Sequence, residues 1–141
     1  MIVLDTNVLS EVLRPRASAN VLGRMRSEPV TALFTTSITE AELLYGLALL
    51  PDGRKRRALE AVIREILAVQ FAGRILPFDS AAAREFASIA VARRQAGRPI
   101  GEADGRIAAI ARSRRAALAT RNVDDFRGCG LVLVDPWTTN D

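Results

Sequence analysis

The sequence is 141 residues long and 49% hydrophobic, which is most simply explained by one globular domain spanning residues 1–141. It has no histidine and a single cysteine, which excludes Ser-His-Asp and Cys-His catalysis, histidine-bearing zinc sites and an internal disulfide. The formal net charge is +4, and arginine carries nearly all of the positive charge, a composition compatible with a nucleic-acid partner.

Short apolar runs alternate along the chain with longer segments of helical periodicity. The first run, residues 1–4, has no polar break and predicts a strand buried on both faces of a sheet. The alternative N-caps are Ser37 or Thr39 for one helix, and Asp79 or Ser80 for another. In chain order, we expect strands at 1–4, 32–36, 75–78, 117–120 and 131–134, and helices at 6–14, 19–27, 38–49, 54–71, 80–95 and 102–115.

This alternation predicts an α/β fold with three layers, α/β/α, around a mainly parallel central sheet. No apolar run reaches the length needed to cross a bilayer, and Met1 leads straight into the first predicted strand. We therefore expect neither a membrane segment nor a signal peptide. The lone Cys129 fits a reducing compartment, so we expect a cytoplasmic protein.

Acidic side chains occur where predicted strands end or the next helix begins. Asp5 follows the first strand directly, and Asp104 lies in the first turn of the last predicted helix. Glu42 lies one turn inside the helix after the second strand, on the side of Tyr45 and Leu49, where a carboxylate needs a partner. Ligands of open α/β sheets bind at the carboxyl ends of strands, which favours a site here. The alternative for Asp5 is a purely structural N-cap.

A further group of oxygen-bearing side chains, Asn122, Asp124 and Asp125, follows the fourth strand. A doubly wound sheet would bring this group close to the other acids, and carboxylates gathered in this way repel one another unless a cation is present. Oxygen ligands without histidine or cysteine favour Mg²⁺ or Mn²⁺ over zinc. Such an ion activates water and neutralises the charge that develops on a phosphodiester.

Five motifs follow one another in a characteristic order. They are Leu4-Asp5-Thr6-Asn7 with Ser10-Glu11, Thr39-Glu-Ala-Glu42-Leu-Leu-Tyr-Gly46, Ala103-Asp104 with Ile107-Ala-Ala109, Thr120-Arg-Asn-Val-Asp-Asp-Phe126, and Val134-Asp-Pro-Trp137. In this combination the chain resembles the PIN-domain ribonucleases, specifically the VapC-type toxins of bacterial toxin–antitoxin pairs. The resemblance covers essentially the whole chain.

The resemblance implies which residues form the site. Asp5, Glu42 and Asp104 would be the acidic site residues, with Asp5 and Asp104 as direct magnesium ligands, and Thr6 would support them through its hydroxyl. The family often has a fourth acid after the fourth strand. Here the first candidate is Asn122, with the neighbouring Asp124 and Asp125 as alternatives. Asparagine is a neutral ligand, so it lowers the charge available for a second metal ion.

The resemblance also implies an activity and partners. The activity would be metal-dependent hydrolysis of RNA phosphodiester bonds, with Mg²⁺ or Mn²⁺ as cofactor. The partners would be RNA, a second copy of the chain in a homodimer, and a small antitoxin protein that inserts a peptide into the active-site groove. Clusters of basic residues are candidates for binding the RNA backbone or for solvated helix faces, namely residues 54–57, Arg93-Arg94 with Arg98, and Arg112 with Arg114-Arg115.

Other functions fit the residues less well. A phosphatase of the haloacid-dehalogenase type requires a second aspartate two residues after the first, where this chain has Asn7. A receiver domain requires a lysine late in the chain, whereas Lys55, the only lysine, lies in the middle. A non-catalytic RNA-binding or scaffold protein on the same fold remains an alternative, because a fold does not determine an activity.

Overall fold

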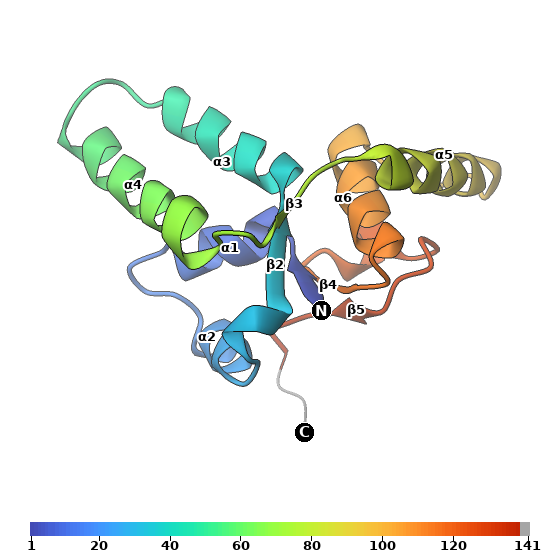
Figure 1. The fold of residues 1–141 in the computed structure, drawn as a ribbon, viewed down its shortest axis with the longest axis horizontal. Helices are drawn as coiled ribbons and strands as arrows, with labels where there is room; N and C mark the ends of the chain where they lie inside the picture. Colours follow the sequence, from blue (N-terminus) through green and yellow to red (C-terminus); the bar gives the residue numbers. More distant parts are fainter. Residues whose placement is uncertain (139–141) are drawn as a thin grey trace.

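The centre of the molecule is a five-stranded sheet, seen edge-on in the computed structural model, which describes residues 1–138 (Figure 1). Its strand order is β3-β2-β1-β4-β5, and all four neighbouring pairs are parallel. The expected α/β class with a parallel sheet is therefore confirmed. The strands are β1 (Ile2–Leu4), β2 (Leu33–Thr36), β3 (Ile75–Leu76), β4 (Ala117–Ala119) and β5 (Leu133–Val134).

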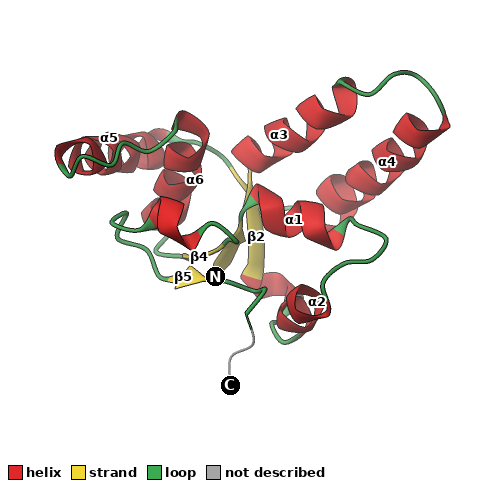
Figure 2. Ribbon diagram, turned by 180° about the vertical axis from the view of Figure 1, so that it is seen from behind, coloured by secondary structure: helices red, strands yellow, loops and turns green. Residues whose placement is uncertain are grey.

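Helices cover both faces of the sheet, which gives the expected three layers (Figures 1 and 2). Helices α5 and α6 lie on one side, while α1, α2 and α4 lie on the other, and α3 forms an antiparallel hairpin with α4. The helices are α1 (Thr6–Val12), α2 (Ala19–Arg26), α3 (Ser37–Ala48), α4 (Arg54–Arg64), α5 (Ser80–Gln95) and α6 (Glu102–Ser113).

The central strand β1 is buried on both of its faces, as its apolar sequence predicts. Val3 packs in a core with Ile89 of α5 and Ile107 of α6, whereas the adjacent Leu4 packs in a second core with residues of α1, α2 and α4. Successive side chains of a strand point to opposite faces, so each of these two residues serves one core. Each face of the sheet thus has its own hydrophobic core.

The structure corrects two local expectations. The N-cap of α3 is Thr36, whose hydroxyl accepts a hydrogen bond from the Thr39 N–H, and neither Ser37 nor Thr39 has that role. This occurs because β2 passes directly into α3 without a loop. The predicted helix over 54–71 changes its hydrogen bonding at Glu65–Gln70, which is a π-helix.

The other element boundaries agree closely with the sequence pattern. Asp79 caps α5 by accepting a hydrogen bond from the Ala82 N–H at 3.0 Å, which selects one of the two predicted caps. The strand before Pro77 lies at the edge of the sheet, where the missing N–H of proline is tolerated. A short 3₁₀ turn, Val123–Phe126, follows β4.

We expect the Ile89→Ala substitution to lower the free energy of unfolding by about 2–5 kcal/mol, because Ile89 is a large apolar side chain in the core between the sheet and α5. Urea unfolding measures this change. Val91→Ala on the same helix is the matched control, because Val91 is 54% exposed, and it should change stability by about 0.5 kcal/mol or less. Equal losses for the two variants would contradict the described placement of α5.

Candidate functional site

The strand order places three carboxyl ends side by side, since β1 lies between β2 and β4. The segments that leave these ends, together with the start of α6, border one pocket of about 460 Å³. Five predicted site residues lie in its lining, namely Asp5, Thr6, Glu42, Asp104 and Asn122. The remaining lining residues are Asn7, Ser10, Glu11, Arg14, Arg121 and Trp137.

Asp5 is the most buried acid of this pocket, with 4% of its surface exposed. One carboxylate oxygen accepts a hydrogen bond from the Thr6 N–H at 2.8 Å, and the other accepts one from the Thr120 hydroxyl at 2.8 Å. Asp5 is therefore the N-cap of α1 and a site residue at once. Burial raises the pKa of Asp5, the two hydrogen bonds oppose this rise, and the charges of Glu42 and Asp125 add to it.

Glu42 is positioned by a row of threonine hydroxyls. The Thr6 hydroxyl donates to Glu42 Oε1 at 2.9 Å and lies 2.9 Å from the Thr39 hydroxyl. Because a hydroxyl has one proton to donate, Thr6 accepts from Thr39, which in turn accepts from the Thr36 hydroxyl at 3.4 Å. One oxygen of the Glu42 carboxylate is thereby fixed by a hydrogen bond from Thr6.

The surroundings of Glu42 differ from the expectation. The helix side that it shares with Tyr45 and Leu49 is exposed to solvent, with Tyr45 at 68% and Leu49 at 66% exposure. Helix α3 is apolar around most of its circumference, so the sequence pattern does not distinguish its packed side from its exposed side. The packed side carries Leu43 and Leu47 instead.

Asp104 lies half-buried in the first turn of α6. Burial is the main cause that raises its pKa, and the charges of Asp5 and Asp125 raise it further, while the nearby Arg93 lowers it. Asp5 and Asp104 therefore interact electrostatically, although one follows β1 and the other begins the sixth helix. Each carboxylate makes the ionised form of the other less favourable.

The segment after β4 is attached to the site by Thr120, a residue whose role the sequence pattern did not reveal. Its buried hydroxyl donates to Asp5 and accepts from the backbone N–H of Asn122 at 3.0 Å and from the Asn7 amide at 3.4 Å. The Asn7 side-chain oxygen accepts from the Arg121 N–H at 3.3 Å. These bonds hold residues 120–122 against the start of α1, with Asn122 exposed at the pocket.

The two aspartates near Asn122 have different surroundings. Asp124 is exposed and forms an ion pair with Arg127 at 2.6 Å. Asp125 does not line the pocket, but its charge raises the pKa of both Asp5 and Asp104. Of these two residues, Asp125 is the one that acts electrostatically on the site.

Glu11, part of the first motif, has a structural role in the described chain. It is buried and accepts hydrogen bonds from the Ser18 N–H at 3.0 Å and from Arg14 at 3.3 Å. The first of these bonds is the main cause that lowers the pKa of Glu11. The side chain thus connects the end of α1 with the start of α2.

The donor set fits a hard divalent cation. Within residues 1–138, no three Cys, Asp or Glu side chains are placed to hold one ion together. The charge of Asp5 nevertheless raises the pKa of Asp104, and a cation in the pocket would relieve this repulsion. Magnesium is commonly held by one or two carboxylates, with water and substrate phosphate as its other ligands, so a pair of acids is compatible with it.

Arg93, which the sequence pattern made a candidate for binding the RNA backbone, has a structural role instead. It is buried, and its guanidinium donates to the backbone carbonyls of Arg98 at 2.7 Å, Asp125 at 2.8 Å and Arg127 at 3.0 Å. It also contacts the sulfur of Cys129 at 3.5 Å. Arg93 is therefore unavailable to a phosphate and instead fastens the segment that carries Asp125.

The chain is similar to known proteins over nearly its whole length. The family model of the PIN domain matches residues 2–128. The chain is 38% identical to the VapC ribonuclease Y4jK of Sinorhizobium fredii, over 97% of this chain and 98% of that protein. It is 39% identical to toxin FitB of Neisseria gonorrhoeae, over 97% of this chain and 99% of that protein. The crystal structure of FitAcB from Neisseria gonorrhoeae superposes with a TM-score of 0.92 at 38% identity, covering 99% of this chain and 100% of that one.

We expect Arg93→Met to lower the free energy of unfolding by about 2–4 kcal/mol, because it removes the buried donor of three carbonyl groups. Urea unfolding gives the value. The control is Arg98→Met, since Arg98 is exposed and donates one bond, to the Asp124 carbonyl at 3.2 Å. That variant should lose less than about 1 kcal/mol, and a larger loss than for Arg93→Met would refute this role.

The raised pKa of Asp104 predicts a pH-dependent stability of the metal-free protein. The unfolded chain releases the Asp104 proton near pH 3.8, whereas the folded chain retains it to a higher pH. The contribution of Asp104 to the free energy of unfolding therefore becomes unfavourable as the pH rises from 3.8 through the raised pKa. Asp104→Asn should therefore become more stable than the unsubstituted protein as the pH increases from about 4 to 7. Asp124→Asn, at the surface ion pair, should show no such trend. Urea midpoints in chelator measure both series.

Proposed function

This chain belongs to the PIN-domain family, and we propose that residues 1–141 form one PIN domain that hydrolyses RNA as the toxin of a toxin–antitoxin pair. The observation that carries the proposal is the meeting of Asp5, Glu42 and Asp104 at one pocket, from three separate parts of the chain. Relatives named as a ribonuclease and as a toxin, each matched over nearly its whole length, support it.

A divalent cation, Mg²⁺ or Mn²⁺, is part of this proposal. Asp5 and Asp104 would hold it, because they are the two acids whose pKa values are raised by burial and by neighbouring negative charge. When bound, the ion would supply activation of water and neutralisation of charge on the phosphodiester.

The protein groups around that cation have distinct tasks in the proposed reaction. The Thr6 hydroxyl donates to Oε1 of Glu42, a residue of the pocket lining, so Glu42 Oε2 would be the oxygen that accepts a proton from the attacking water. Thr120 and the Thr6 N–H keep the Asp5 carboxylate in one orientation. Asn122 lines the pocket as a neutral oxygen ligand, and Asp125 contributes negative charge nearby.

The partners proposed for this domain are RNA, an antitoxin and a second copy of the chain. An arginine from an antitoxin peptide would pair with the acids of the pocket and compete with the cation. The homodimer is supported by the exposed apolar side chains Leu44 and Tyr45 of α3 and Leu49 at its C-cap, which a second copy would cover. Within residues 1–138 no helix is long and apolar enough to span a membrane. The lone Cys129 fits a reducing compartment, and we propose the cytoplasm.

A non-catalytic protein on the same fold is the second candidate, favoured by the neutral Asn122 where the family often has an acid. The presence of Asp5, Glu42 and Asp104 at one pocket argues against it, since a binding module has no need for acids that repel one another. Cleavage of RNA separates the two candidates directly.

We expect the purified protein, freed of any bound antitoxin, to cleave cellular RNA at discrete positions with Mg²⁺ or Mn²⁺. Asp5→Asn should reduce the rate by at least about a hundredfold, because it removes a negative ligand from the cation site. Gel electrophoresis and end-mapping of the fragments measure the products. A chelator should abolish them in the same way.

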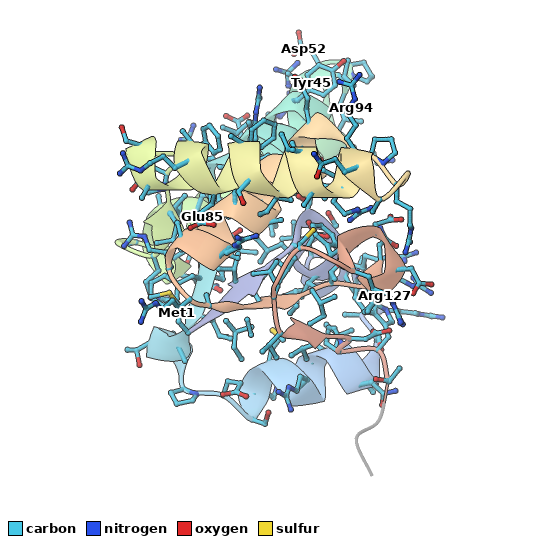
Figure 3. All side chains as sticks on the ribbon, turned by 90° about the vertical axis from the view of Figure 1, so that its right-hand side faces the viewer. Met1, Tyr45, Asp52, Glu85, Arg94 and Arg127 are labelled. Atoms are coloured by element: carbon cyan, nitrogen blue, oxygen red, sulfur yellow. The ribbon has the colours of Figure 1, made fainter. Side chains whose placement is uncertain are left out.

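Asp52→Asn is the matched control for this experiment. Its carboxylate is exposed in the turn between α3 and α4, at the tip of the molecule and away from the pocket (Figure 3). This variant should cleave like the unsubstituted protein. Cleavage that survives Asp5→Asn would show that the site is misplaced, and a folded, metal-loaded protein that cleaves nothing would favour the binding module.

A further inference from the structure

The lining of the acidic pocket also includes basic and aromatic side chains. Arg14, Arg121 and Trp137 line the same hollow as the acids, yet the proposed hydrolytic chemistry uses none of them. None belongs to the arginine clusters that the sequence pattern singles out. These three side chains therefore need a separate explanation.

Two hydrogen bonds of its backbone groups hold Trp137 in place. Its N–H donates to the Asp135 carboxylate at 2.9 Å, and its carbonyl accepts from the Asn20 side chain at 2.8 Å. The half-buried ring packs against the core shared by α1, α2 and α4. The indole thus lines the pocket and is held in position by these contacts.

Arg121 lies with its guanidinium over the Trp137 ring. Its guanidinium carbon is 5.1 Å from the centroid of the Trp137 ring, within the range of a cation–π interaction. Its backbone N–H donates to the Asn7 side chain, two residues after Asp5, so the chain at Arg121 is fastened to the site itself. The guanidinium is consequently presented at a defined place beside the acids.

Arg14 and Arg121, the two arginines that line the pocket, differ in their ion pairing. Arg14 pairs with Glu11 at 3.3 Å and Arg112 pairs with Glu85 at 2.7 Å. Among the residues that the structure describes, Arg121 forms no salt bridge. An exposed guanidinium with several unused N–H groups is suited to bidentate binding of a phosphate.

We propose that Arg121, positioned by Trp137, forms a phosphate-binding subsite that holds the RNA backbone next to the bond to be cleaved. This inference rests on the proposed ribonuclease function and adds the residue that anchors the substrate. Because Arg121 and the acids border one pocket, a single strand presents one phosphate to the guanidinium and a neighbouring phosphate to the acidic end. Trp137 is a positioning residue, since it restricts the guanidinium without needing to touch RNA.

The test measures RNA binding separately from cleavage. In the Asp5→Asn background, a fluorescein-labelled single-stranded RNA of mixed sequence is titrated by fluorescence anisotropy at several salt concentrations in Mg²⁺. Arg121→Met should raise Kd about three- to tenfold and reduce the slope of log K against log salt by about 0.7, the contribution of one phosphate contact to a single strand. Arg121→Lys should retain most of the slope.

Two further variants complete the design. Trp137→Leu leaves the Arg121 charge in place, so it should weaken binding less than Arg121→Met while keeping the salt slope. Arg64→Met removes an arginine of α4 that lies outside the pocket lining, and it should change neither quantity. Circular dichroism and thermal melting verify that each variant is folded, and Arg121→Lys alters only an exposed side chain.

Kinetics with otherwise unsubstituted protein distinguish the possible failures. If Arg121→Met raises KM several-fold with a smaller change in kcat, the subsite is supported. If RNA is cleaved but Arg121→Met binds it with unchanged Kd and slope, the subsite is refuted and the ribonuclease function stands. If the Asp5→Asn parent binds no RNA and the unsubstituted protein cleaves none, both proposals fail. If Arg121→Met instead weakens only the binding of an acidic peptide, the surface serves a protein partner and the RNA subsite is refuted.

Discussion

The burial of the Asp5 carboxylate at the end of the central strand is the constraint on which the site depends. A buried carboxylate is tolerated only with hydrogen-bond donors, and these come from the N-terminus of α1 and from the Thr120 hydroxyl after β4. The Thr120 donor requires the correct strand pairing, since the register that sets Leu4 beside Ala119 also brings Asp5 next to Thr120. The Asp5 N–H completes this junction by donating to the Ala119 carbonyl at 2.9 Å.

Neutral hydroxyls organise the acids without reducing the pocket's negative charge. The row from Thr36 through Thr39 and Thr6 reaches Glu42 from the β2 side, while Thr120 reaches Asp5 from the β4 side. Threonine is suited to this task because its branched side chain has few rotamers within a helix or strand. The acids are thereby fixed in position while their charges remain available to a cation.

The arginines divide into two groups by what they contact. Some are used within the fold, such as Arg93, which fastens the Asp125 segment, and Arg112, which pairs with Glu85 and donates to the Cys129 carbonyl. Arg121 lies beside the acids, supported by an aromatic ring. A pocket lined by both acids and a guanidinium supported by an aromatic ring suits a substrate that is anionic and also needs a cation, as an RNA backbone does.

From the amino-acid sequence we could predict the fold class, the order of the main elements, and three acids, Asp5, Glu42 and Asp104, that the fold brings to one pocket. This was possible because strand burial, helix periodicity and capping are local properties, and because acids at strand ends stand out from apolar surroundings. The contacts of Thr39, Thr120, Arg93 and Arg121 became visible only in the folded chain. Several of these contacts join segments that are far apart in the sequence, by 32 residues for Arg93 with Asp125 and by 115 residues for Asp5 with Thr120. Such contacts leave no periodic signal in a single sequence.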